Sequence, residues 1–236
     1  MRLIKKYGLY IVSCLLFLDS FFVIYGLGKF RVYTISILMP LIIIYYYKNS
    51  KRSKKSITFT NVLVALILVF ASDIIYLINN FVLKNTLEWL FVLRICLLLV
   101  ANLVFGYIFN HIKKLKISKC PEAFIISLVT IPLALVLFKF LNVVELGNYK
   151  YSILIAMLIM VIVIALATNI FGDKAKKSIA YENYIPGSVS LALSLGLIAV
   201  YKFLIPDVDF LPAVITLTQG FGYLLLVSGF VKYLKV

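Results

Sequence analysis

Long apolar segments separated by short polar connections make up most of the 236-residue chain. Each segment is about 20 residues long, which is the length that an α-helix needs to cross the hydrocarbon core of a bilayer. This pattern predicts eight membrane-spanning helices. Their expected ranges are 8–27, 31–48, 59–79, 88–110, 122–145, 150–171, 186–205 and 210–233.

The composition agrees with a membrane protein. Hydrophobic residues make up 64% of the chain and charged residues 14%, and the mean hydropathy is +1.08. A soluble domain contains about 45–50% apolar residues, so a soluble fold could not bury this much apolar surface. The connections are too short to fold as a separate domain. We therefore predict an all-α, polytopic integral membrane protein whose residues 1–236 form a single helical-bundle domain.

The formal net charge of +15 gives the expected orientation in the membrane. Most of the 24 Lys and Arg residues fall in both termini and in the connections after the second, fourth and sixth predicted spans. Basic residues are enriched in cytoplasmic loops, so both termini are expected in the cytoplasm, in a bacterial cytoplasmic membrane. Because these residues lie between apolar segments, we expect them to contact anionic lipid head groups and not nucleic acid.

Asp73 lies within the third predicted span, six residues before Asn79 and Asn80. With a helix rise of about 1.5 Å per residue, its depth is about 9 Å from the edge of the apolar layer. Arg94 lies at nearly the same depth in the next span, and a short connection makes these helices antiparallel neighbours. An ionisable group in hydrocarbon is costly and is usually paired or functional. Two interpretations remain open, a buried Asp73–Arg94 ion pair and a catalytic or ligand-binding carboxylate.

Two more charged residues fall inside predicted spans, Asp19 in the first and Lys139 in the fifth. Their depths from the same end of the bundle are similar to those of Asp73 and Arg94, so the four could form one polar cluster. Lys139 could instead extend to the interface. The chain has no metal-binding motif, and its one histidine, His111, has no neighbouring ligand, so we expect no metal and no cofactor.

Four apolar stretches carry a further pattern: RVYTISILMPLIIIYY in the second span, LVFASDIIYL in the third, SLALSLGLIAVYKF in the seventh and GYLLLVSG in the eighth. They resemble the patterns T-K-P-L-L-M-P-L-L, S-x-x-G-D-x-x-L, F-x-x-S-D-x-x-L-A-x-N-K-F and A-Q-x-L-I of the YhhN family. This family of eight-helix membrane proteins includes lysoplasmalogenases, which hydrolyse the vinyl-ether bond of lysoplasmalogens. The resemblance covers nearly the whole chain and implies that Asp73 is a catalytic carboxylate.

Three polar positions of the family pattern carry other residues in this chain. Ile35 replaces a lysine, Asn102 replaces a histidine, and Leu195, beside Ser194, replaces a second aspartate. Vinyl-ether hydrolysis needs one acid to protonate the enol-ether carbon and a second group to activate water, and both must reach the substrate. Because Leu195 cannot complete the acid pair, either Asp19 replaces it or the activity is weak or lost.

The sequence is therefore consistent with three functions. The chain is a lysoplasmalogenase-type lipid hydrolase with Asp73 as its catalytic residue, a non-catalytic protein that binds a single-chain lipid or another amphiphile, or a small transporter or sensor subunit with a buried charge cluster. Membrane lipids, including a lysophospholipid, are the expected partners. The candidate substrate-binding residues are Asp19, Arg94, Asn102, Lys139, Ser194 and Gln219.

Overall fold

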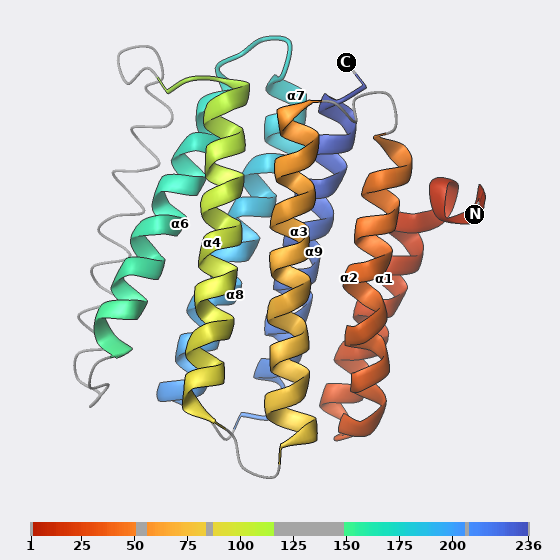
Figure 1. Cartoon of the computed structure of the whole chain (residues 1–236), viewed down its shortest axis with the longest axis vertical. Helices are drawn as coiled ribbons and strands as arrows, with labels where there is room; N and C mark the ends of the chain where they lie inside the picture. The colour runs from red at the N-terminus through yellow and green to blue at the C-terminus, as the bar shows by residue number, and fades with distance from the viewer. Residues whose placement is uncertain (1, 51–55, 84–86, 116–148, 206–207, 236) are drawn as a thin grey trace.

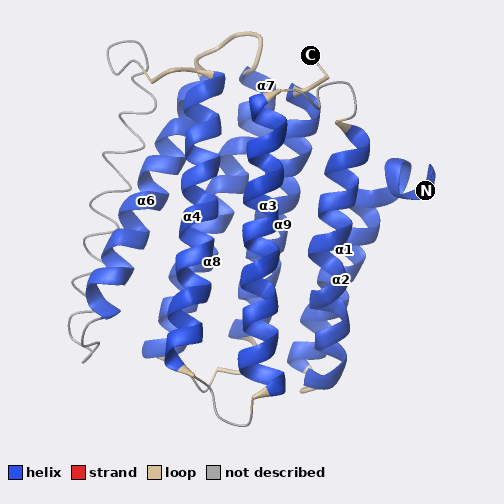
Figure 2. Cartoon of the chain, in the orientation of Figure 1, coloured by secondary structure: helices blue, strands red, loops and turns tan. Residues whose placement is uncertain are grey.

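The computed structural model describes residues 2–50, 56–83, 87–115, 149–205 and 208–235. Within these ranges the chain folds into helices and contains no strand (Figure 2). The longer helices are α1 (Arg2–Ile24), α2 (Gly28–Asn49), α3 (Ile57–Leu77), α4 (Glu88–Ile112), α6 (Tyr149–Phe171), α8 (Ile185–Phe203) and α9 (Leu211–Tyr233). The π-helical turn η2 (Ile78–Val82) extends α3, and the short α7 (Lys177–Ile179) and η4 (Ala180–Tyr184) lead into α8.

Six helical segments within the described ranges are long and apolar enough to cross a membrane, which supports an integral membrane protein. They are Tyr7–Ile24, Gly28–Asn49, Ile57–Val82, Glu88–Ile112, Lys177–Lys202 and Leu211–Tyr233. The apolar part of α6 is shorter, Ile155–Phe171. Each predicted span other than the fifth coincides with one of these helices, and the fifth, 122–145, lies outside the described residues.

Local sequence signals explain several helix ends. Gly26, in the turn between α1 and α2, has a φ of +67°, a backbone conformation that glycine adopts without steric cost. Ser56 caps α3, because its side chain accepts a hydrogen bond from the backbone N–H of Phe59 at 3.1 Å. Pro212 lies in the first turn of α9, where a missing backbone N–H leaves no helical hydrogen bond unmade. Pro186 lies at the start of α8, which follows the π-helical turn η4 directly.

Helix α9 lies at the centre of the bundle and contacts α1, α2, α8 and η4 (Figure 1). In its membrane-length window 56% of the residues are buried, against 39% or less in the other five candidate spans. Small residues allow this close packing. A Cβ atom on Gly222 would lie 2.7 Å from Leu191 Cδ2 of α8, and one on Gly220 would lie even closer to Leu16 of α1.

The two ends of the bundle differ in the side chains that they bring together. Toward the end at which α4 and α9 finish, Phe105, Phe109, Tyr184 and Phe230 form a buried aromatic cluster. The ring centroid of Tyr184 lies 5.1 Å from that of Phe109 and 5.0 Å from that of Phe230. Toward the other end, where α4 and α9 begin, polar side chains surround a cavity. The candidate site lies at this end, where the charged side chains line the cavity.

Candidate functional site

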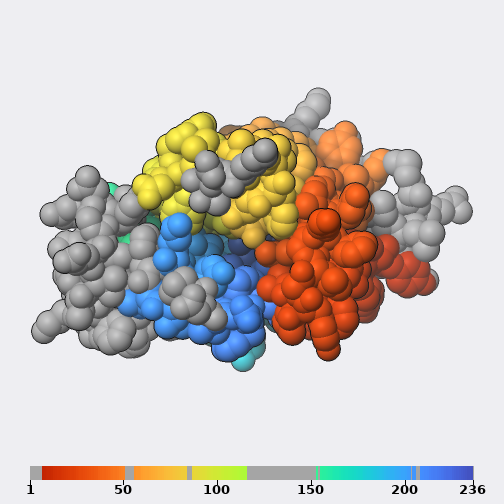
Figure 3. All heavy atoms as spheres, turned by 90° about the horizontal axis from the view of Figure 1, so that it is seen from below, coloured from red at the N-terminus to blue at the C-terminus, as the bar shows by residue number. Residues whose placement is uncertain are grey.

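A cavity of about 250 Å³ lies between α2, α3, α4, α8 and α9. The view onto this end of the bundle shows the α1–α2, α3–α4 and α8–α9 pairs converging around it (Figure 3). The apolar part of the cavity wall includes Ile35, Leu38, Met39, Ile198 and Ile215. The charged residues that line the cavity are Arg31, Asp73, Glu88, Arg94 and Lys202. The site thus combines apolar walls with charges of both signs.

Arg31 joins four helices by its guanidinium group. Its Nε lies 3.3 Å from Oδ2 of Asp19, its Nη1 donates to the Tyr76 hydroxyl at 2.8 Å, and its Nη2 donates to the Thr216 hydroxyl at 2.9 Å. The Thr34 hydroxyl donates to the other carboxylate oxygen of Asp19. Asp19 is only 1% exposed, so this is a buried ion pair held by hydrogen bonds. Each of the three guanidinium nitrogens of Arg31 thus has a partner in the protein, and these contacts hold α1, α2, α3 and α9 together.

The prediction that Asp73 and Arg94 form a direct ion pair is wrong. Among the residues that the structure describes, no N–O approach within 4.0 Å joins their charged groups. Tyr76 provides the physical reason, because it lies about one turn after Asp73 on α3 and presents its ring to Arg94. The guanidinium carbon of Arg94 lies 4.3 Å from the centroid of that ring. The two charges still interact through space, and both residues line the cavity.

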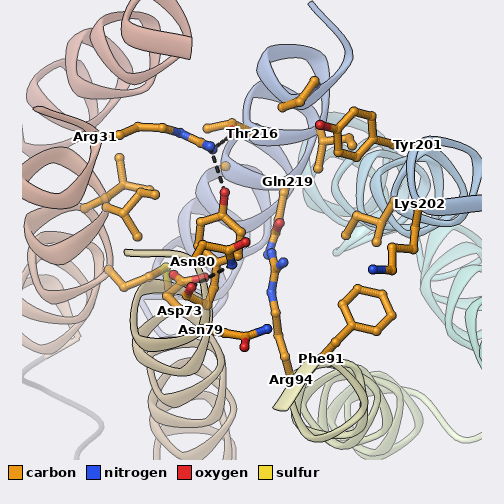
Figure 4. Close-up of a pocket in the computed structure, with 18 of the residues that line it drawn as sticks. Arg31, Asp73, Asn79, Asn80, Phe91, Arg94, Tyr201, Lys202, Thr216 and Gln219 are labelled. Carbon is orange, nitrogen blue, oxygen red and sulfur yellow. Dashed lines mark hydrogen bonds between the residues drawn. The ribbon is translucent and has the colours of Figure 1, made fainter. Parts of the chain in front are cut away.

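Arg94 has an incomplete set of hydrogen-bond partners. Its Nε atom is buried and has no partner within the described part of the chain. The close-up shows Arg94 of α4 and Gln219 of α9 pointing toward one another across the cavity (Figure 4). Buried donors without a partner are uncommon in folded proteins, and each such group needs an explanation.

The cavity brings together three of the predicted site residues, Asp73, Arg94 and Gln219. Asp19 does not line the cavity, because it lies behind Arg31. Lys139 lies outside the described residues, so the predicted four-residue cluster stays a prediction. Among the described residues, the Asp19–Arg31 pair lies beside Asp73 and Arg94.

The other two predicted residues are buried between helices and do not line the cavity. The Asn102 side-chain amide donates to the Leu98 carbonyl at 2.9 Å, and the Ser194 hydroxyl donates to the Leu191 carbonyl at 2.8 Å. Leu195 packs against the apolar core and is likewise absent from the cavity lining.

Sequence reasoning missed Arg31 and Tyr76 as site residues. Arg31 lies at the very start of the second predicted span, where a basic residue usually marks the membrane surface. Its distance of twelve residues from Asp19 is the one available signal, because a tight turn between two helices brings these positions to the same depth. Tyr76 lies three residues after Asp73, and therefore on nearly the same face of the helix.

The chemistry available at the site is that of cations and carboxylates. Within the described ranges, no group of three or more His, Cys, Asp or Glu residues could hold a metal ion. Lys202 lies over the ring of Phe91, with its Nζ atom 5.4 Å from the centroid, and points toward the same space as Arg94 (Figure 4). The site can therefore bind an anionic group at its arginine and lysine side chains and a cationic or hydrogen-bonding group at Asp73.

No protein-family model, no curated protein and no solved structure matches the chain. The fold of the described residues is helical, and several of its helices are long and apolar enough to cross a membrane. The protein therefore belongs to the class of helical integral membrane proteins.

Proposed function

We propose that this protein binds a single-chain phospholipid or a similar amphiphile, whose head group enters the cavity between α2, α3, α4, α8 and α9. One observation carries the proposal: the cavity has apolar walls and also charged side chains of both signs. An amphiphile with a phosphate and an amine or hydroxyl group matches both features. The resemblance of four stretches of the chain to the YhhN family points to the same class of ligand.

Hydrolysis of the bound lipid is, in this proposal, weak or absent. Asp73 faces the cavity and could act as a general acid. The position of the family's second aspartate is Leu195, which is partly buried against the apolar core and does not line the cavity. A general acid and a water-activating group must both reach the substrate, so Asp73 needs another partner. Glu88, the other carboxylate that lines the cavity, is the remaining candidate.

A cavity-blocking variant tests the proposal. Ile35 lines the cavity, whereas Ile37 is 47% exposed on the outer surface of the same helix. Binding of a fluorescent lysophosphatidylcholine to purified protein should be lost in Ile35→Trp and kept in Ile37→Trp. Both variants should be folded, as judged by a cooperative thermal transition in detergent. Equal binding by these two variants would place the lipid outside the cavity and contradict the proposal.

The proposal includes the topology of the chain in the membrane, with eight spans and both termini on the cytoplasmic side. Ile112, at the end of α4, and Tyr149, at the start of α6, lie at opposite ends of the bundle (Figure 1). The distribution of basic residues along the sequence supports this orientation. The cavity then opens on the outer surface. In a variant without native cysteines, Lys29→Cys should react with an impermeant reagent added outside, and Ala175→Cys should not.

A small transporter or sensor subunit is the second candidate. The observation that favours it is the continuous series of polar contacts from Asp19 through Arg31 to Tyr76, and from the Tyr76 ring to Arg94. Such a series could relay a proton or an ion through the bundle. Proteoliposomes that hold a pH-sensitive dye would show proton flux dependent on Asp19 in that case, and no such flux if the protein only binds lipid.

A further inference from the structure

We propose that Arg94 is the anion-binding residue of the cavity, and that it receives the phosphate oxygens of the bound head group together with Lys202. This inference rests on the proposed function and names the chemical group that the cavity recognises. Both side chains point into the same space, Arg94 from α4 and Lys202 from α8 (Figure 4).

Arg31 and Arg94 differ in how many of their nitrogens have hydrogen-bond partners. Both arginines line the same cavity, and both lie beside the Tyr76 ring, at 5.6 Å for Arg31 and 4.3 Å for Arg94. The Arg31 guanidinium directs its three nitrogens to Asp19, Tyr76 and Thr216. The Arg94 guanidinium has no hydrogen bond or ion pair to any described residue, and its Nε is buried without a partner. Arg31 is therefore a structural residue, and Arg94 has donors left for a ligand.

Arg94 is partly exposed to the cavity, and its Nε atom is buried. A cation in such a place without a contacting anion is costly, because part of its lost hydration is not replaced. Asp73 offsets part of that cost through space, but it accepts none of the Arg94 donors. The planar guanidinium can donate two parallel hydrogen bonds to a phosphate, which a lysine cannot do. The Tyr76 ring holds the group in place through a cation–π contact. Arg94 is thus oriented before any anion arrives.

Lys202 adds a second positive charge at the opening of the cavity. Its side chain is exposed, and no carboxylate of a described residue lies within 4.0 Å of its Nζ atom. A flexible ammonium group at the opening and a fixed guanidinium farther in suit a phosphate that enters from the membrane surface. The same chemistry would accept inorganic phosphate from the aqueous phase, so the experiment must separate these two sources.

The test compares three probes that bind to the full-length protein in a neutral detergent: lysophosphatidylcholine, a monoacylglycerol with the same acyl chain, and inorganic phosphate. In Arg94→Met the affinity for lysophosphatidylcholine should fall about 10- to 100-fold, as expected for a lost hydrogen bond to a charged group. The affinity for the monoacylglycerol should not change. Lys29→Met is the matched control, because Lys29 is exposed at the same end of the bundle and does not line the cavity.

Folding of the variant is measured separately by thermal unfolding without lipid. Arg94→Met should unfold at nearly the same temperature as the wild type, because Arg94 makes no hydrogen bond or ion pair to a described residue. Arg94→Lys keeps the charge but not the planar geometry, and it should bind lysophosphatidylcholine with intermediate affinity. If Arg94→Met does not fold, the role of Arg94 is still tested by Arg94→Lys. It is also tested by the preference of the wild type for lysophosphatidylcholine over monoacylglycerol.

The outcomes separate this inference from the proposed function. Equal affinity of the wild type for lysophosphatidylcholine and the monoacylglycerol would overturn the role of Arg94 and leave lipid binding intact. Binding of neither lipid would overturn both proposals, unless inorganic phosphate binds in an Arg94-dependent way. In that last case the anion site stands, its source is the aqueous phase, and the lipid-binding proposal fails.

Discussion

The guanidinium group of Arg94 lies 4.3 Å from the centre of the Tyr76 ring. It makes this contact in place of the ion pair with Asp73 that their shared depth suggests. The hydroxyl group of the same tyrosine accepts a hydrogen bond from Arg31. The Tyr76 hydroxyl group thus holds Arg31, whose three nitrogens all have partners, and the Tyr76 ring lies against Arg94, whose Nε has none. The two roles can be separated by mutation.

Tyr76→Phe removes only the hydroxyl group. We expect it to lower the free energy of unfolding by about 1.5–3 kcal/mol, because Arg31 loses one hydrogen bond while its charge stays buried. Lysophosphatidylcholine affinity should remain near that of the wild type, since the ring still lies under Arg94. Tyr76→Leu removes the ring as well and should weaken that affinity. Thermal unfolding and lipid titration of both variants measure the two effects, and an equal loss of lipid affinity in both would contradict the assignment.

Asp19→Asn should destabilise the bundle strongly. Removing one member of a buried ion pair leaves the other charge uncompensated and commonly costs about 3–5 kcal/mol. Asp173→Asn is the matched control, because Asp173 pairs with Lys176 at 3.0 Å but is partly exposed. A surface pair contributes about 0–1 kcal/mol. Thermal unfolding in detergent should therefore show a large decrease for Asp19→Asn and a small one for Asp173→Asn.

A double variant shows whether the Asp19 effect arises from the uncompensated charge of Arg31. Asp19→Asn combined with Arg31→Met removes both charges and should recover part of the stability lost in Asp19→Asn alone. Simple addition of the two single effects would indicate that Asp19 does not stabilise the protein through Arg31.

The helices were predictable from the sequence, but the contacts among their polar residues were not. Apolar length alone located α1 to α4, α6, α8 and α9, because a bilayer sets the length of each span. Counting residues at about 1.5 Å each also placed Asp73 and Arg94 at one depth, and both line the same cavity. Depth does not fix the rotation of a helix about its axis. The ion-pair prediction failed because depth also does not indicate that the Tyr76 ring lies against Arg94.

That rotation is difficult to infer because a membrane helix is apolar on both its buried and its lipid-facing sides. Ile35 and Ile37 illustrate the point, since they have the same side chain two residues apart. Ile35 lines the cavity, and Ile37 is exposed on the outer surface. Arg31 was missed for a related reason, because an arginine at the end of a span usually reaches the membrane surface and this one turns inward to Asp19.

Gly229→Ala should destabilise the buried aromatic cluster. A Cβ atom at this position would lie 2.6 Å from the Tyr184 ring and 2.8 Å from Asn183 Cβ. The Tyr184 ring is fully buried between Phe109 and Phe230 and cannot move aside. Overpacking of this kind typically costs about 1–3 kcal/mol.

Gly196→Ala is the control for this prediction. A Cβ atom on Gly196, in α8, would meet nothing within 4 Å. Alanine has a higher helix propensity than glycine by about 1 kcal/mol, so this variant should be as stable as the wild type or slightly more stable. Equal melting temperatures for Gly196→Ala and Gly229→Ala in detergent would show that Tyr184 does not pack against α9 in this way.

The hydrolytic activity of the wild-type protein toward lysoplasmalogen should be weak or undetectable. Loss of one acid–base partner typically lowers a rate by about 10²- to 10⁴-fold, and Leu195 supplies no carboxylate to the cavity. Aldehyde release from lysoplasmalogen measures this activity. Any residual rate should fall in Asp73→Asn, and it should also fall in Glu88→Gln if Glu88 activates the water.

Restoring the family residues tests whether their absence explains the weak activity. Ile35→Lys places an ammonium group in the cavity lining, whereas Leu195→Asp places a carboxylate at a partly buried position against the apolar core. We therefore expect the double variant to lose thermal stability, and to gain turnover only if α8 rotates so that the new carboxylate reaches the cavity near Asp73. A large gain without loss of stability would mean that residue 195 already faces the substrate. Rapid hydrolysis by the wild type that Asp73→Asn abolishes would show that the present cavity already holds a complete acid–base pair.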